Sequence, residues 1–280
     1  MRLQEYGVGI FSSCPTKSSL KKKLKKELIY VNGEKASSAT FIHTGDKIEL
    51  VNEEISVATR KMEYPLEVIY EDEHLAAVFK PAGIQVSGNK FKTIANALEQ
   101  NLKKSTLPDT CHPQPVHRLD FPTTGVLLVG KTSSSIRALN QMFEIKEIQK
   151  SYMAVSMGEM KSSKGEFQEA IDNKEAHTSY EVLESVISER FGFLNLVILH
   201  PRTGRKHQIR KHLSGHGNAI LGDADYSPEE LILKGKGLYL HAYSVEFIHP
   251  FTKEILTVQA PIPKKFLKLF DSLQTNSVSL

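Results

Sequence analysis

Leucines recur at every fourth position between residues 20 and 28, and six lysines lie among and just before them. This spacing predicts a helix with one apolar stripe and a basic outer face. Residues 28–31 predict a short strand, Asn32-Gly33 a tight hairpin turn, and residues 44–50 a turn that leads into a further strand. The pattern therefore predicts a small α/β module at the start of the chain.

From residue 66 onward the apolar runs become longer and alternate with helical stretches. The helical spacing falls at residues 93–103 and 136–143. The strand pattern predicts three pairs, at residues 66–70 with 75–79, 178–186 with 193–199, and 239–248 with 254–258. Because hairpin-type links outnumber strand–helix–strand units, we expect an α+β fold with a mixed, largely antiparallel sheet and flanking helices.

The length of 280 residues is enough for about two domains. We expect a small basic module at residues 1–52, a linker at 53–64, a main domain at 65–273 and a loose polar tail at 274–280. No internal repeat is visible in the sequence. The main domain is therefore the place to look for a reactive site.

The overall composition is ordinary for a globular protein, with 40% hydrophobic and 24% charged residues. The net charge is only +4, so its distribution is more informative than its size. The lysines of the first module form one group: Lys17, Lys21, Lys22, Lys25 and Lys26. Two interpretations stay open for them, a solvated helix face or a surface that follows the phosphates of a nucleic acid.

Several classes of protein are disfavoured by what the sequence lacks. Cys14 and Cys111 are the only cysteines and have no metal-binding spacing, and His207 and His212 lack an HExxH arrangement, so we expect no metal. No glycine loop of a nucleotide or dinucleotide site is present, so we expect no cofactor. No apolar run approaches the roughly 18 residues of a membrane helix, and no secretion signal is visible. We expect a cytoplasmic protein.

The most informative stretch is Val-His-Arg-Leu-Asp-Phe-Pro-Thr-Thr-Gly at residues 116–125, which precedes the apolar run 126–129. Asp120 lies close to Arg118 on a loop that ends where a buried strand begins. A carboxylate at the edge of a buried strand has rigid support, as a reactive group requires. An ordinary loop ion pair between Arg118 and Asp120 is the simpler alternative.

Three further segments combine polar side chains with residues that set the backbone: Lys-Pro-Ala-Gly at 80–83, Lys-Ser-Tyr at 150–152, and Pro-Arg-Thr-Gly-Arg-Lys-His-Gln-Ile-Arg at 201–210. Ile-Leu-Gly-Asp at 220–223 and Tyr226 follow them. Each piece by itself fits a turn or a core strand. Their order and spacing carry more information than any one of them.

Together, from residue 66 to residue 266, these segments resemble the RluA-like family of RNA pseudouridine synthases. The chain departs from the usual family pattern at Thr124, where serine is common, and at Lys206, where threonine is common. Residues 17–22, 31–35 and 44–48 resemble an S-four-like RNA-binding module. The resemblance implies a pseudouridine synthase fold with an appended small α/β RNA-binding module.

The family resemblance implies that a uridine in RNA is detached from its glycosidic nitrogen, rotated, and rejoined to the ribose through carbon. It assigns Asp120 as the catalytic carboxylate and Arg210 as its buried cationic partner. A carboxylate in a closed pocket needs such a cation, because burial alone raises its pKa and neutralises it. Tyr152 is implied as a residue that stacks on the base and takes part in proton transfer. Asp120 attacks the ribose, attacks the ring or removes a proton; these alternatives stay open.

The resemblance also implies a set of substrate-binding residues. Ile209 would pack on the base, and Arg118 would fill the gap left by a flipped uridine, since a planar guanidinium replaces part of the lost stacking. Arg205 and His117 complete this set. Arg205, like His207, is interpreted as structural or phosphate-facing rather than catalytic.

Two rival functions remain to be weighed. A non-catalytic RNA-binding protein on the same fold would be favoured if Asp120, Tyr152 or Arg210 were replaced, and all three are present. A hydrolase that uses Asp120 with His117 would need a metal or an oxyanion-stabilising glycine loop, and neither is visible. We therefore expect a monomeric isomerase whose partner is ribosomal or transfer RNA, with no membrane partner.

Overall fold

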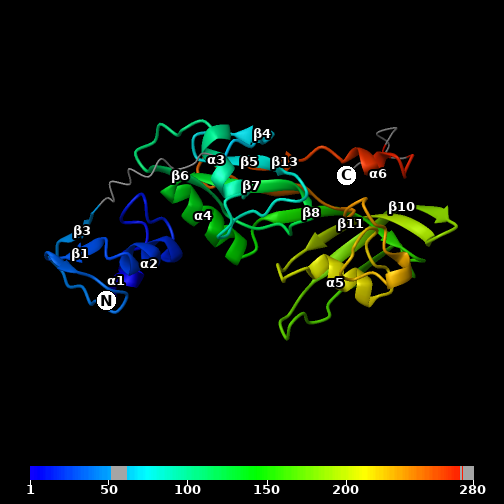
Figure 1. The fold of residues 1–280 in the computed structure, drawn as a ribbon, viewed down its shortest axis with the longest axis horizontal. Helices are drawn as coiled ribbons and strands as arrows, with labels where there is room; N and C mark the ends of the chain where they lie inside the picture. The colour runs from blue at the N-terminus through cyan, green and yellow to red at the C-terminus, as the bar shows by residue number, and fades with distance from the viewer. Residues whose placement is uncertain (52–61, 272, 274–280) are drawn as a thin grey trace.

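The computed structural model describes residues 1–51, 62–271 and 273. Most of the predicted linker and all of the predicted tail lie outside the described residues. Figure 1 shows the N-terminal module at one end of the molecule, next to helix α4 (Ser133–Glu144) of the main domain. Among the described residues, no helix combines the length and the apolar character that crossing a membrane requires.

The N-terminal module has the predicted small α/β organisation. Its three strands form a sheet in the order β2-β1-β3, with both pairs antiparallel. Asn32 and Gly33 have φ angles of 51° and 83°, as the predicted tight hairpin turn requires. The elements of the module are α1 (Leu3–Tyr6), α2 (Lys17–Lys25), β1 (Ile29–Val31), β2 (Glu34–Lys35) and β3 (Ile48–Leu50).

Helix α2 is shorter than the leucine spacing predicts. It begins after Thr16, whose side chain accepts a hydrogen bond from the backbone N–H of Ser19. Leu20 and Leu24 are buried, as expected for the apolar stripe. The prediction that Leu28 continues the stripe is wrong: Glu27 adopts a left-handed φ of 57°, the helix ends, and Leu28 leads directly into β1.

The main domain is built on a ten-stranded sheet in the order β4-β5-β7-β12-β8-β11-β10-β9, with β13 paired to β12 and β6 paired to β7. Among the described strands of this sheet, only the pair β7 and β12 is parallel. The predicted mixed, largely antiparallel α+β fold is therefore confirmed. The strands are β4 (Val68–Glu71), β5 (Leu75–Lys80), β6 (Thr110–Pro115), β7 (Thr124–Thr132), β8 (Gln149–Met157), β9 (Lys164–Phe167), β10 (Thr178–Ser188), β11 (Gly192–Pro201), β12 (Leu240–Ile248) and β13 (Ile255–Gln259).

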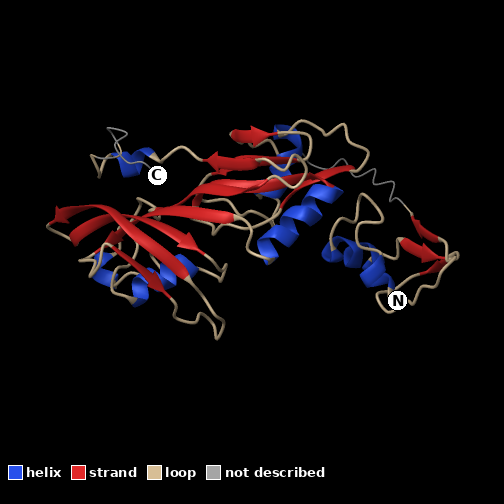
Figure 2. Cartoon of the chain, turned by 180° about the vertical axis from the view of Figure 1, so that it is seen from behind, coloured by secondary structure: helices blue, strands red, loops and turns tan. Residues whose placement is uncertain are grey.

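Helices cover both faces of this sheet, as Figure 2 shows. Successive side chains of a strand point to opposite faces. Ala76 and Val78 of β5 accordingly share a buried cluster with α3 (Ile94–Asn101), whereas Leu75 and Ala77 share one with α4. The other half of the sheet packs with α5 (Gln208–Gly215) and α6 (Lys264–Leu267). A short 3-10 helix, Glu229–Leu231, lies between α5 and β12.

The remaining predictions differ from the structure mainly at element ends. The predicted helix 136–143 begins earlier, at Ser133, because Thr132 and Ser135 form a reciprocal cap. The predicted strands 178–186 and 193–199 are confirmed as the antiparallel pair β10 and β11, and each is longer than predicted. Strands β6 and β9 were not predicted, because their sequences are too polar or too rich in proline to give a strand pattern.

Candidate active site

A cavity of about 1050 Å³ lies where β8 and the end of β11 meet the loop before β7 and the start of α5. Three of the four segments singled out in the sequence line it, within residues 116–123, 150–152 and 201–210. The fourth, residues 80–83, follows β5 and is hydrogen-bonded to the first. Segments far apart in the chain therefore meet at one place.

The loop that carries Asp120 is held by a buried lysine. Lys80, at the end of β5, is completely buried, and its Nζ donates to the carbonyls of Pro81 at 3.0 Å, Phe121 at 3.2 Å and Thr123 at 2.7 Å. Burial lowers the pKa of Lys80 to about 8, and the charge of Asp120 opposes this shift. Two of these bonds fix the backbone on the C-terminal side of Asp120, which orients the carboxylate.

The start of β7 is tightly packed against β12. Gly125 has a φ of 120°, and a Cβ atom there would lie 2.1 Å from the carbonyl oxygen of Ala242. Only glycine allows the two parallel strands to come this close. Thr124, one of the departures from the family pattern, forms a 2.8 Å hydrogen bond with Nδ1 of the buried His241. The hydroxyl that threonine shares with serine makes this contact.

Asp120 lies in the cavity with its side chain 18% exposed, between two cationic or basic groups. Its Oδ2 is 4.0 Å from Nη1 of Arg210, and its Oδ1 is 3.8 Å from Nε2 of His207. In the described part of the chain, these are the cationic or basic side chains within 4.0 Å of the Asp120 carboxylate. The simpler interpretation, a loop ion pair with Arg118, is therefore wrong.

Arg210 is buried and is bonded mainly to two other carboxylates. Its Nε and Nη2 donate to Asp223 at 2.7 Å and 2.6 Å, and Nη2 also donates to Asp225 at 2.6 Å. Its guanidinium lies 4.8 Å from the ring centre of Tyr226. Burial alone would lower the pKa of Arg210, but its bonds to the two carboxylates raise it, so the cation next to Asp120 is permanent.

Asp223 was not predicted as a site residue. The sequence showed Gly222 and Asp223 after an apolar pair, but nothing in the sequence indicates which cation the carboxylate meets. Gly222 explains the local backbone: it has a φ of 79°, and a Cβ atom there would lie 2.0 Å from the carbonyl oxygen of Gly237. This turn directs the fully buried carboxylate of Asp223 toward α5.

The other predicted catalytic and substrate residues lie around the same cavity. Tyr152 reaches it from β8, and burial, helped by the charge of Asp120, raises the pKa of its phenol above the usual range, so the phenol stays protonated. Ile209 is buried in the cavity wall at the start of α5. Arg118 is exposed and lines the cavity.

His117 lines the cavity, but its ring is already occupied. Its Nε2 accepts a 2.9 Å hydrogen bond from the backbone N–H of Leu128. Burial, together with the charge of Lys150, lowers the pKa of His117 to about 3, so the ring is neutral. A ring held in this way supports the strand that follows the Asp120 loop. The hydrolase hypothesis needs this nitrogen as a base, and the backbone occupies it.

Arg205 and His207, interpreted together from the sequence, lie in different surroundings. The Nε of Arg205 donates to the carbonyl of Glu175 at 2.8 Å, which ties it to the loop before β10. His207 has a left-handed φ of 55° and places its ring between Asp120 and the hydroxyl of Tyr226. Sequence reasoning missed this position of His207.

Comparison with known proteins is consistent with this geometry. A family model described as RNA pseudouridylate synthase matches residues 74–215. The chain is 31% identical to an uncharacterized RNA pseudouridine synthase of Aquifex aeolicus (strain VF5), over 94% of this chain and 90% of that protein. It is 30% identical to ribosomal large subunit pseudouridine synthase C of Escherichia coli (strain K12), over 92% and 88%.

The chain belongs to the RNA pseudouridylate synthase family. It is therefore an RNA-modifying isomerase. The solved structure of human RNA pseudouridylate synthase domain containing 4 is similar, with a TM-score of 0.59 and 25% identity, and the match covers 74% of this chain and 93% of that chain.

The lining of the cavity in this pseudouridine synthase is rich in basic side chains. Among the residues that line it, the acidic ones are Asp120 and Glu144. Basic side chains outnumber them: Arg118, Lys146, Lys150, Arg202, Arg205, Lys206 and Arg210. A rim of this charge attracts the phosphates of an RNA strand and raises the rate of encounter.

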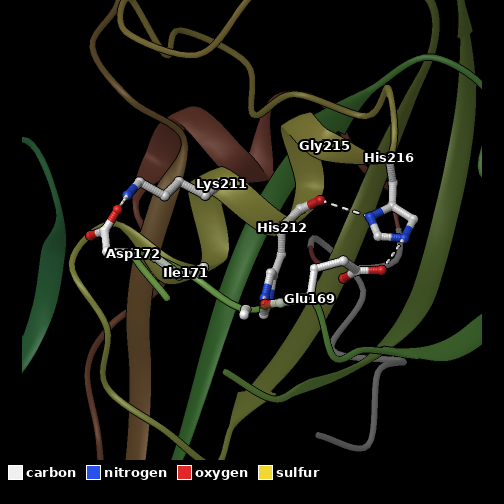
Figure 3. A pocket seen from close by; sticks show the side chains of 8 residues that line it. Glu169, Ile171, Asp172, Lys211, His212, Gly215 and His216 are labelled. Atoms are coloured by element: carbon white, nitrogen blue, oxygen red, sulfur yellow. Dashed lines mark hydrogen bonds and ion pairs between the residues drawn. The ribbon is translucent and has the colours of Figure 1, made fainter. Parts of the chain in front are cut away.

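A second cavity of about 400 Å³ lies against α5 and is built from different residues (Figure 3). There Lys211 pairs with Asp172 at 2.9 Å, and His216 pairs with Glu169 at 3.3 Å. These pairs join the segment before β10 to α5. Within the described part of the chain, no group of three or more His, Cys, Asp or Glu residues is arranged to hold a metal.

Proposed function

We propose that this pseudouridine synthase flips specific uridines of structured RNA into the 1050 Å³ cavity and isomerises them with Asp120 as the catalytic carboxylate. The observation that carries the proposal is the position of Asp120. Its carboxylate, 18% exposed, faces the cavity with the guanidinium of Arg210 at 4.0 Å. Flipping is required because the reacting bond is inaccessible in stacked RNA, and it costs a few kcal/mol.

The charges around Asp120 support a carboxylate that works in its ionised form. A base that fills the cavity excludes water, which by itself favours the neutral acid. Arg210 opposes this change, and because Asp223 and Asp225 already hold the guanidinium, it does not need to move. An ionised oxygen serves attack on the ribose, attack on the ring and proton removal alike, so the proposal includes all three.

The remaining cavity residues have complementary roles in this proposal. Tyr152 and Ile209 supply a phenol and an apolar surface for the base. Arg118, exposed at the cavity, takes the place of the flipped base in the RNA stack. Arg205 and the basic rim contact phosphates. His117 acts indirectly, by supporting β7 through its bond to Leu128.

We propose large-subunit ribosomal RNA as the substrate, because several relatives are named ribosomal large subunit pseudouridine synthase C. Transfer RNA is the alternative that the same experiment tests. The proposal places the enzyme in the cytoplasm. We propose that it acts as a monomer.

The decisive experiment replaces Asp120 and maps pseudouridine in ribosomal and transfer RNA from cells with and without the enzyme. Asp120→Asn and Asp120→Ala are expected to lower turnover by roughly a thousandfold or more, because each removes the reacting oxygen's charge. RNA affinity is expected to stay within about twofold, since the basic rim is intact. The matched control is Asp172→Asn, which changes an acid of the second cavity.

The opposite result has a clear meaning. If Asp120→Asn keeps its turnover while RNA binding is lost, Asp120 is a binding residue and the proposal is wrong. If the unchanged enzyme binds RNA but adds no pseudouridine to either RNA class, the non-catalytic alternative is correct instead.

A further inference from the structure

His207 holds a left-handed backbone conformation, which is uncommon for residues other than glycine. Its φ of 55° and ψ of 28° are left-handed, and it occupies the cap position before α5 without capping the helix through its side chain. Such a conformation is disfavoured for a residue other than glycine, and it persists at functional sites where the surroundings enforce it. The position therefore needs an explanation through the imidazole ring.

Both ring nitrogens of His207 face groups of the site. Nδ1 is 2.8 Å from the hydroxyl of Tyr226, and Nε2 is 3.8 Å from Oδ1 of Asp120. Tyr226 is held in place: its carbonyl accepts a 2.7 Å bond from Ser214, and its ring lies 4.8 Å from the Arg210 guanidinium. The two rings meet edge to face, at 83°.

This arrangement selects one tautomer of the neutral ring. When the phenol of Tyr226 donates to Nδ1, the proton of the ring lies on Nε2 and is directed toward Asp120. The other tautomer would present a lone pair to a carboxylate. The pKa of His207 is lowered, mainly by burial, and the charges of Arg210 and Lys206 add to this effect. The charges of Asp120 and Asp225 oppose it. The neutral form with the Nε2 proton is therefore favoured.

We propose that Tyr226 and His207 are positioning residues for the pseudouridine synthase reaction: Tyr226 orients His207, and the Nε2 proton of His207 orients Asp120 as the base fills the cavity. This inference rests on the proposed function of Asp120. The 3.8 Å separation shortens to a hydrogen bond in the RNA complex, because catalytic contacts of this kind are commonly long without substrate. Protonation of His207 removes the acceptor for Tyr226 and makes Asp120 a weaker base.

The test compares Tyr226→Phe and His207→Asn with the unchanged enzyme. Tyr226→Phe removes the hydroxyl and keeps the ring beside Arg210, and asparagine tolerates the left-handed backbone at position 207. Turnover is followed on transcribed large-subunit ribosomal RNA, through release of tritium from the uridine carbon that becomes glycosidic. We expect kcat to fall roughly tenfold in each variant, with KM within about twofold, since Asp120 is no longer held in its reactive orientation.

The pH profile separates positioning from a merely structural role. In Tyr226→Phe the neutral ring loses a donor, so the pKa of His207 rises and the acid limb of kcat is expected to move to higher pH. In His207→Asn the contribution of His207 to that limb is expected to disappear. The controls are Tyr243→Phe and His112→Asn, which lie outside the cavity lining and are expected to keep kcat and the profile.

Three outcomes decide the inference. A lower kcat with the shifted acid limb supports it. Unchanged kcat in both variants overturns it, and so does a fall that is equal at every pH or confined to KM or Tm. Asp120→Asn distinguishes the two proposals: an active Asp120→Asn variant overturns the proposed function, whereas an inactive one beside active Tyr226→Phe and His207→Asn variants overturns only the positioning role.

Discussion

At the scale of single residues, two histidines near Asp120 in the same cavity differ in what remains free on their rings. The Nε2 of His117 accepts a hydrogen bond from the backbone N–H of Leu128. His207, in contrast, directs one nitrogen to Tyr226 and the other to Asp120. Residue type and nearness in sequence favoured His117 as the histidine that acts with Asp120. Hydrogen-bond partners, which no sequence pattern encodes, favour His207 for that role.

The partly buried, neutral ring of His117 makes a prediction about stability and pH. Its pKa is about 3 in the folded protein, below its ordinary value of 6.5, so between these values the unfolded chain binds the proton and the folded chain does not. Stability is therefore present above the unfolded pKa and lost as pH falls through this window. His117→Gln keeps an acceptor for Leu128 and removes the titration.

Between about pH 6 and pH 4, acidification lowers the free energy of unfolding of the unchanged protein. In His117→Gln we expect this decrease to be smaller by up to about 1.4 kcal/mol per pH unit, because His117 no longer takes up a proton on unfolding. Urea unfolding at a series of pH values measures the difference. His112→Gln, at an exposed histidine, is the control. An identical slope in His117→Gln and the unchanged protein would show that His117 is not buried as a neutral ring.

At the scale of elements, α5 connects the two cavities of the main domain. Its first turn directs Ile209 and Arg210 into the large cavity. Gln208 also lines the large cavity, and it donates to the hydroxyl of Thr178 at 2.9 Å, which ties the helix to β10. Lys211 and His212 line the second cavity (Figure 3). One helix therefore carries residues that line each cavity and a residue that ties it to the sheet, on different sides, as a period of 3.6 residues allows.

The ion pairs of Arg210, on α5, with Asp223 and Asp225 lead to a matched pair of predictions. Asp223 and Asp225 both bind Arg210, but the Asp223 side chain is 0% exposed and the Asp225 side chain 63% exposed. Asp223→Asn is expected to destabilise the protein by roughly 3–5 kcal/mol, because it leaves a buried guanidinium without its main counter-charge. Asp225→Asn is expected to cost under about 1 kcal/mol, as exposed ion pairs do.

Chemical unfolding of both variants, with turnover measured in parallel, checks this pair. Turnover of Asp223→Asn is expected to fall as well, since Arg210 is then free to move away from Asp120. Equal stability losses in the two variants would contradict the assignment of Asp223 as the main partner.

At the scale of the whole molecule, the N-terminal module contacts the main domain at α4. Ser133 donates to the carbonyl of Ser12 at 2.9 Å, and Arg137 donates to the carbonyl of Gly9 at 3.3 Å. The lysines predicted to bind RNA, Lys17, Lys21, Lys22, Lys25 and Lys26, are exposed on α2 and its C-terminal cap. Their role in RNA binding stays a prediction.

Replacement of these five lysines by glutamine tests whether α2 contacts RNA. If it does, RNA affinity falls and the dependence of log Kd on log salt flattens by roughly 0.7–0.9 for each phosphate that α2 no longer neutralises. Binding to transcribed ribosomal RNA at several salt concentrations measures the slope, and Lys253→Gln, at an exposed lysine of the β12–β13 turn, is the control. An unchanged slope would make α2 a solvated face only.

Much of this protein is determined by local sequence. The roles of Asp120, Tyr152, Ile209 and Arg210 are implied by the family resemblance, and the fold brings these residues to one cavity. Apolar spacing predicts helices α2, α3 and α4 and three strand pairs within a few residues. These features are accessible because periodicity and turn chemistry act over short stretches of chain.

The tertiary structure decided which charges meet. The pairing of Arg210 with Asp223, the three carbonyls around Lys80, and the path from Tyr226 through His207 toward Asp120 join residues from separate elements. The polar strands β6 and β9 likewise form only because neighbouring strands supply their hydrogen-bond partners. Such interactions depend on how elements pack, and their free energy is gained only once distant segments have been brought together.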